Sequence, residues 1–188
     1  MRAGDILRCL TQARPSLLKL RNLGKPYDPL IDTLVSIGED DRLPSSKDLQ
    51  KKFSVSPANI KKWIDTLYND FIQSLRSDPD FLECQGVLCD IYVKGYRGSV
   101  SFLCRLPVIP RIGEQVKFPF LGCLTGSSFL YVSDVIYCIV DSELSVEIWV
   151  RAGQHNRHFQ YLKDKAEYEG WLRNHQHQFL HDSELEGG

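Results

Sequence analysis

Residues 43–67 read LPSSKDLQKKFSVSPANIKKWIDTL, and this stretch decides the fold of the N-terminal part of the chain. Ser45 or Ser46 is a natural N-cap for a helix over 46–53, because a serine hydroxyl accepts a hydrogen bond from a backbone N–H of the first turn. The short connection over 54–56 follows at once. A helix, a turn of three to four residues and a second helix make a helix-turn-helix, and the sequence predicts one here.

The second helix of this motif begins after Ser56, which caps it, and Pro57 occupies its first position, where a missing N–H costs nothing. It runs to about residue 76. We expect a small apolar core to fix the angle between the two helices, formed by Leu49, Phe53, Val55, Ile60 and Trp63. The residues predicted to point outward from the start of the second helix are Pro57, Ala58, Asn59, Lys61 and Lys62.

A helix that projects from such a motif fits the major groove of duplex DNA, and its first turns reach the base edges. We therefore expect Asn59, Lys61 and Lys62 to enter the groove. The residues expected to hold phosphates are Ser45, Lys47, Lys51, Lys52 and Ser56. From Arg42 to Lys62 there are six basic residues and one acidic residue, a net charge of +5, and such a charge favours a polyanion.

The same 25-residue stretch resembles the helix-turn-helix of GntR-type winged-helix transcription regulators. The matching positions are Leu43-Pro44-Ser45, Leu49, Val55-Ser56, Ile60 and Leu67. The resemblance implies a DNA-binding module in which Ser45, Ser56 and Asn59 lie near phosphates or bases. The chain departs from the family pattern at Gln50 and Trp63, and residues 81–93 lack the glycine-rich hairpin that forms the family's wing.

The alternative interpretation uses the same helices without DNA. Lysines on two helix faces also serve simply to solvate them, and helix-turn-helix folds dock proteins as well. The second hypothesis is therefore a non-enzymatic protein-protein adaptor.

Before this motif, residues 3–23 show helical periodicity that Pro15 is expected to break, giving two short helices. A further helix is predicted over 29–38, closed by Gly38. We expect residues 1–80 to form a helical domain.

After residue 80 the apolar period changes from 3.6 to 2, which is typical of strands. The predicted strands cover 86–94, 99–105, 114–120, 129–140 and 143–151. They suggest an α+β protein in which residues 81–188 form a small antiparallel barrel, SH3-like or OB-like, followed by a helix over 160–180 that packs back on it. A loop of small residues is predicted over 122–128. The barrel would mediate self-association or bind a protein partner.

The chain has 188 residues, of which 43% are hydrophobic and 25% charged, as in soluble globular proteins. Residues 1–77 carry a net charge of +4 and residues 78–188 a net charge of −5, which favours two modules. The sequence shows neither a membrane-spanning segment nor a secretory signal, so we expect a cytoplasmic protein that does not bind membranes.

The residues that most often carry chemistry form no recognisable site. The six cysteines lack C-x-x-C spacing, and several fall in apolar runs, so we expect buried thiols and no metal. Two histidine pairs, His155 with His158 and His177 with His181, have helical spacing but no third ligand at an evident spacing. No nucleotide-binding or nucleophile motif occurs, so we expect no cofactor and no enzymatic activity.

Overall fold

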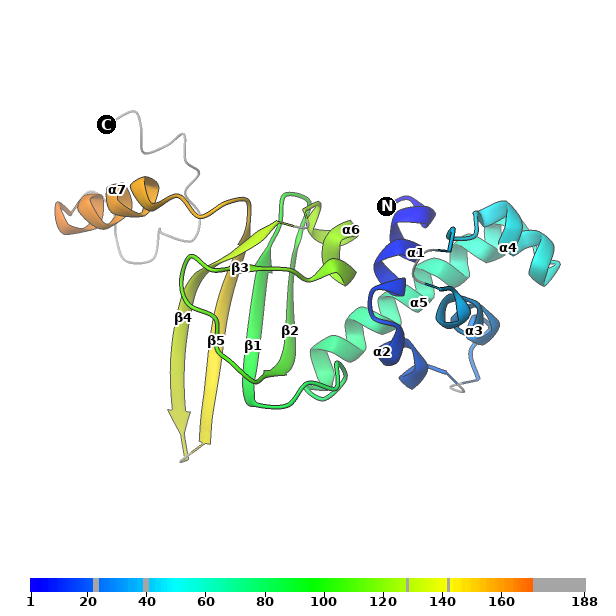
Figure 1. Ribbon diagram of the computed structural model, residues 1–188, viewed down its shortest axis with the longest axis horizontal. Helices are drawn as coiled ribbons and strands as arrows, with labels where there is room; N and C mark the ends of the chain where they lie inside the picture. Colours follow the sequence, from blue (N-terminus) through cyan, green and yellow to red (C-terminus); the bar gives the residue numbers. More distant parts are fainter. Residues whose placement is uncertain (22–23, 39–40, 128, 142, 171–188) are drawn as a thin grey trace. The chain divides into compact units, whose positions relative to one another are not determined.

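The computed structural model describes residues 1–21, 24–38, 41–127, 129–141 and 143–170 (Figure 1). The chain has α+β architecture in which helices come first and strands second, as predicted. It divides into two compact units, Met1–Gly153 and Gln154–Gly188. The predicted domain boundary at residue 80 lies inside the first unit and stays a prediction.

Five helices precede the sheet: α1 (Ala3–Thr11), α2 (Arg14–Lys19), α3 (Asp28–Ser36), α4 (Ser46–Phe53) and α5 (Pro57–Ser77). The predicted break near Pro15 is confirmed. This proline stands in the first turn of α2, where its missing N–H leaves no hydrogen bond unmade.

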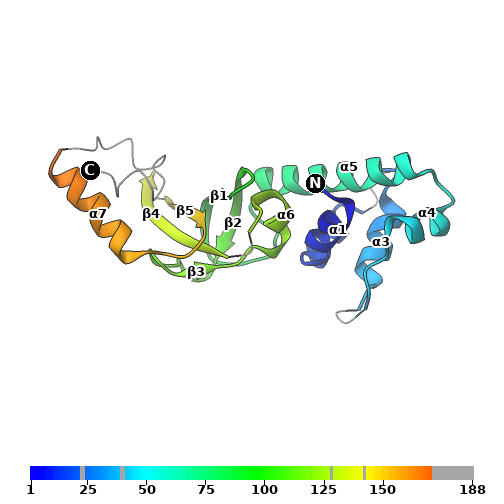
Figure 2. The same cartoon turned by 90° about the horizontal axis from the view of Figure 1, so that it is seen from above.

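Helix α5 is the central element of the helical part, and it contacts α1, α4 and β2. In Figure 2 it runs along one side of α1, α3 and α4. Its buried residues recur at helical spacing and are Ile60, Ile64, Leu67, Tyr68, Phe71, Ile72 and Leu75. A stripe of this kind stabilises a long helix through tertiary packing rather than through intrinsic propensity.

The strands are β1 (Val87–Lys94), β2 (Ser99–Leu106), β3 (Gln115–Val116), β4 (Leu130–Val140) and β5 (Glu143–Ala152), and they pair in the order β2-β1-β5-β4-β3. They form one curled sheet (Figures 1 and 2). The prediction of an antiparallel barrel is wrong in one respect, because β1 and β5 are parallel, with Ile91 opposite Ile148. Among the described residues β2 and β3 are edge strands, so the sheet is open.

The segment between β3 and β4 also differs from expectation. The strand predicted over 114–120 contains only two paired residues, because Pro119 opens a 3₁₀ turn, η1 (Pro119–Leu121). The loop predicted over 122–128 instead begins with a helical turn, α6 (Gly122–Thr125). Gly126 ends this turn in the left-handed conformation, with φ of 75°.

One continuous core joins the helices to the sheet. Alternate residues of β1, β2 and β5 are buried, as the period of two predicts. Phe71 of α5 contacts Phe81, just before the first strand, and Phe120 of η1. Phe120 in turn contacts Phe102 of β2. An aromatic cluster therefore connects the two halves of the first unit.

The second unit contains α7 (Arg157–Tyr168), which confirms part of the helix predicted over 160–180. Residues 171–180 lie outside the described part of the chain, as do His175, His177 and His181. Asn156 begins the helix, and its Oδ1 accepts a hydrogen bond from the N–H of His158 at 3.0 Å. Within the described ranges, none of the helices combines the length and apolarity that crossing a membrane would require.

Candidate nucleic-acid interface

Helix α4 begins at a complete capping box. The Ser45 hydroxyl accepts a hydrogen bond from the N–H of Asp48 at 3.3 Å, and Asp48 Oδ2 accepts one from the N–H of Ser45 at 2.9 Å. The hydroxyl also donates to Asp48 Oδ2 at 2.7 Å. These hydrogen bonds from Ser45 lower the pKa of Asp48 below its usual value. The only acidic residue between Arg42 and Lys62 is therefore used to start the helix.

The turn between α4 and α5 is fixed by backbone geometry. Ser54 adopts the left-handed conformation, with φ of 56° and ψ of 38°, and the N–H of Val55 donates to the Gln50 carbonyl at 3.3 Å. Ser56 then caps α5, because its Oγ accepts a hydrogen bond from the N–H of Asn59 at 3.3 Å. The predicted helix, turn and helix over 46–76 are confirmed as local structure, and α5 ends one residue later, at Ser77.

The small core predicted between these helices is present. Leu49 and Ile60 are buried, and Phe53, Val55 and Trp63 are half-buried against them. The rings of Phe53 and Trp63 lie 5.8 Å apart with an interplanar angle of 53°. Tilted aromatic pairs of this kind are stabilising, so the angle between α4 and α5 is held by packing as well as by the turn.

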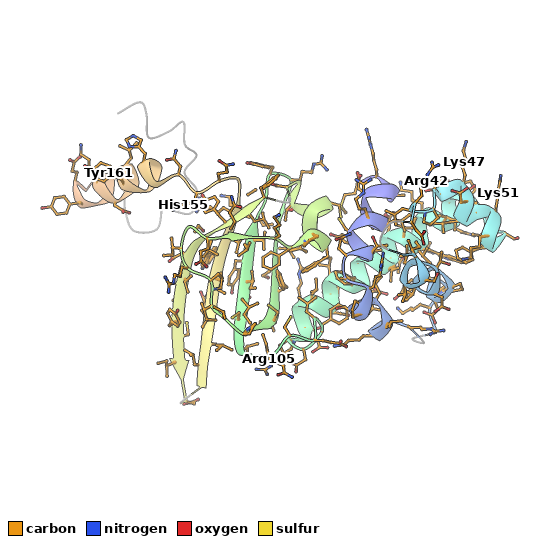
Figure 3. The ribbon with its side chains drawn as sticks, viewed as in Figure 1. Arg42, Lys47, Lys51, Arg105, His155 and Tyr161 are labelled. Atoms are coloured by element: carbon orange, nitrogen blue, oxygen red, sulfur yellow. The ribbon has the colours of Figure 1, made fainter. Side chains whose placement is uncertain are left out.

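The predicted outward residues of α5 are all exposed: Pro57, Ala58, Asn59, Lys61 and Lys62. The residues predicted to hold phosphates are also exposed: Ser45, Lys47, Lys51, Lys52 and Ser56. In Figure 3, Arg42, Lys47 and Lys51 lie together beside α4, with Lys47 and Lys51 pointing away from the helices. Arg42 was part of the basic run in the sequence but not of the predicted site, and its position beside the two lysines adds it to the candidate interface.

Lys52 differs from the other lysines. Its Nζ donates to Thr33 Oγ1 in α3 at 3.0 Å and lies 5.8 Å from the centre of the Phe53 ring. A cation over an aromatic face is attracted by the ring, so this side chain is already engaged within the protein. Lys52 therefore ties α4 to α3, a role that spacing along one helix does not reveal.

The remaining lysines are not neutralised. Within the described ranges, no ion pair at 4.0 Å or less involves Lys47, Lys51, Lys61 or Lys62. Asp65, one helical turn after Lys61, is half-buried. Together with Arg42, these residues place positive charge on α4, on the segment before it and on the first turns of α5. We call these five residues the basic surface. Asp48 lies close enough to Arg42 and Lys51 to interact with both charges.

The structure gives little support to a metal site among the residues considered from the sequence. In the part of the chain that is described, no group of three or more His, Cys, Asp or Glu residues is arranged to hold a metal ion. The cysteines are all free. Four are buried, as expected, whereas Cys84 is exposed and Cys138 is half-buried.

The capping box gives a testable consequence. Replacing Ser45 by alanine is expected to lower the free energy of unfolding by about 1 kcal/mol, because an N–H of the first turn loses its partner. The pKa of Asp48 is lower in the folded protein than in the unfolded chain. The stability lost in the variant is therefore largest at pH values above the pKa of the unfolded chain, and it shrinks as the pH falls through the pKa of the folded protein. Chemical denaturation of Ser45→Ala at several pH values measures both effects. Ser46→Ala is the matched control, since the Ser46 side chain makes no hydrogen bond with any described residue, and an equal loss in both variants would contradict this assignment.

Comparisons with models of known families, with curated proteins and with solved structures gave no match. Any function proposed for this chain therefore rests on its sequence and on the geometry of the basic surface.

Proposed function

We propose that α4, the turn over 54–56 and α5 act as a helix-turn-helix that binds duplex DNA, in a non-enzymatic regulator of transcription. The observation that carries this proposal is the basic surface, which combines exposure, lack of ion pairs and a rigid support. Charges that already have partners release few counterions on binding, whereas unpaired lysines contribute fully to affinity for DNA.

In this proposal the first turns of α5 enter the major groove. Asn59 offers the amide that pairs two hydrogen bonds with adenine, and Lys62, three residues later, lies on the same helix face. Lys61 is exposed as well, on another side of the helix. The start of α5 also offers backbone donors. Pro57 has no N–H and the N–H of Asn59 is taken by Ser56, so the N–H of Ala58 is available inside the first turn for a phosphate.

The phosphate contacts come from α4 and its flanks. Lys47 and Lys51 are one turn apart on the same helix face, and Ser45 and Ser56 stand at the starts of α4 and α5. Lys52 contributes only if it releases Thr33, so its share is smaller.

The resemblance of residues 43–67 to GntR-type regulators supports the same proposal. The protein differs from that family after the motif. The first two strands beyond α5 belong to the five-stranded sheet, in which β1 lies between β2 and β5, so they form no separate wing. Base readout in this proposal depends on α5 alone.

Salt dependence tests the proposal directly. If Lys47 and Lys51 on the phosphates and Lys61 and Lys62 in the groove each displace one counterion of the DNA, the logarithm of the affinity falls with that of salt concentration with a slope of about −3.6. The affinity for random duplex DNA should then fall roughly 150-fold between about 50 and about 200 mM salt. Fluorescence anisotropy with a labelled duplex measures this slope. Absence of binding at the lower salt concentration, or binding that is independent of salt, would rule out the proposal.

A second candidate function is the protein-protein adaptor, and a specific observation favours it. Large apolar side chains near the turn between β4 and β5 are exposed: Ile136, Tyr137, Ile139 and Leu144. Exposed apolar side chains that cluster often mark a surface for a protein partner. Capture of a partner that survives reversal of the charge of Lys61 and Lys62, but is lost in Ile139→Lys, would favour the adaptor.

A further inference from the structure

Two cysteines and a tyrosine meet where the helices join the sheet half of the first unit. Cys9 lies on α1, Tyr68 on α5 and Cys123 on α6. The exposed fractions of the two cysteines are 6% and 5%, and Tyr68 is 2% exposed. The sequence gives no hint of this cluster, since the cysteines are 114 residues apart.

The Cys9 thiol contacts the backbone of Cys123 directly. The backbone N–H of Cys123 donates to Cys9 Sγ at 3.1 Å. A Cβ placed on the neighbouring Gly122 would stand 4.0 Å from the same sulfur atom. The Tyr68 hydroxyl donates to the Phe120 carbonyl at 3.3 Å, next to this pair. The Cys9 sulfur atom therefore lies against the backbone of Cys123, within reach of the short Cys123 side chain.

The surroundings make the two thiols unequal. A hydrogen bond from Cys9 and another from Tyr68 lower the pKa of the Cys123 thiol below its usual value. The pKa of the Cys9 thiol is raised, because it hydrogen bonds to Cys123 and because it is buried. The pKa of Cys123 is therefore the lower of the two, and in such a pair the thiol with the lower pKa is the nucleophile and the other resolves the intermediate.

A second pair of cysteines provides an internal comparison. Cys89 on β1 faces Cys104 on β2 directly across the ladder. Burial raises the pKa of Cys89 to about 11 and that of Cys104 to about 12. These thiols are close in space but stay protonated, so proximity alone does not make a cysteine pair reactive.

We propose that Cys9 and Cys123 form a reversible disulfide when the protein meets hydrogen peroxide, and that this bond fastens α1 to α6. The Cys123 thiolate attacks one peroxide oxygen, the O–O bond breaks, and a sulfenic acid and hydroxide result. The Cys9 thiol then attacks the sulfenic sulfur atom, its proton leaves with the hydroxyl group as water, and the S–S bond forms. Two thiols lose two electrons in total, and one peroxide becomes two waters.

The disulfide would close a loop that spans most of the first unit. A cross-link between distant residues restricts the unfolded chain and stabilises the folded one. Because α1 belongs to the helical part and α6 to the segment between β3 and β4, oxidation would hold these two parts together covalently. The oxidised protein should therefore melt at a higher temperature than the reduced protein, and dithiothreitol should reverse the change.

The experiment treats Cys84→Ser protein, which lacks the one fully exposed thiol, with hydrogen peroxide and follows the intact mass without reductant. We expect the mass to fall by two hydrogen atoms, and chymotryptic peptides to show Cys9 joined to Cys123. Cys104→Val, which removes the comparison pair, should leave the reaction unchanged. Tyr68→Phe keeps both thiols but removes a hydrogen bond from Cys123, and it should slow the reaction severalfold.

Three results would overturn the proposal. They are a disulfide that joins Cys89 to Cys104 instead, oxidation of Cys123 to a sulfinic acid without a cross-link, and equal rates in the Tyr68→Phe and unmodified proteins. The Tyr68→Phe comparison does not depend on whether a cysteine variant folds, because all the cysteines of the cluster remain. The melting temperature of each variant before oxidation shows whether it is folded.

Discussion

Reversing the charge of Lys61 and Lys62 together is expected to weaken binding to duplex DNA by roughly 100-fold at moderate salt, since each positive charge lost from the groove is worth about 1 kcal/mol or more and each new carboxylate repels the DNA. Both lysines are exposed on the first turns of α5 and have no ion pair with any described residue. The salt slope should become shallower by about two units, one for each counterion no longer released. Fluorescence anisotropy at several salt concentrations measures both quantities.

The matched control is the double variant Arg76→Glu with Lys117→Glu. It changes the net charge by the same amount, but Arg76 lies in the last turn of α5 and Lys117 follows β3, and both are exposed. The control should bind DNA nearly as well as the unmodified protein. Equal losses in the two double variants would mean that only net charge matters, and the helix-turn-helix would not be the interface. Unfolding curves should coincide for the unmodified protein and the Lys61/Lys62 variant, since neither lysine packs against the core.

Local sequence signals predicted α4, the turn over 54–56 and α5 well. The capping serines, Pro57 and the apolar stripe of α5 act over a few residues, and the structure places α4 and α5 at the predicted residues, to within one. The hairpin over 87–106 could be predicted equally well from the sequence, because Gly95 and Gly98 bracket its turn and apolar residues alternate in the strands on both sides. Exposure of Asn59, Lys61 and Lys62 followed from the same periodicity.

The features that sequence reasoning missed depend on contacts between distant residues. Nothing in the local pattern of residues 87–94 or 143–152 reveals that these strands run parallel to each other. The contact of Lys52 with Thr33 depends on how α3 packs on α4, and the pairing of Cys9 with Cys123 depends on how α1 meets α6. Each of these relations is set by tertiary packing, which a periodicity of 2 or 3.6 does not encode.

The junction between helices and sheet is the part of the fold most sensitive to mutation, and Phe71 is its central residue. Its side chain is fully buried. Its ring lies 5.4 Å from that of Phe81 and 5.9 Å from that of Phe120, both at steep angles, and 6.5 Å from that of Tyr68. Phe71 therefore packs against another residue of α5, against the segment before β1 and against the 3₁₀ turn η1.

Replacing Phe71 by alanine should lower the free energy of unfolding by about 4 kcal/mol, because the loss of buried apolar surface is joined by the cost of a cavity. For a chain of this size the melting temperature should fall by roughly 10 °C. Since the ring packs against both halves of the first unit, we expect one cooperative transition that shifts as a whole in calorimetry. Phe129→Ala is the matched control, because Phe129 is 59% exposed and its loss should change stability by about 0.5 kcal/mol or less. A calorimetric trace that splits, with one transition left at its original temperature, would show that the helices of residues 1–80 and the sheet unfold independently and that Phe71 does not couple them.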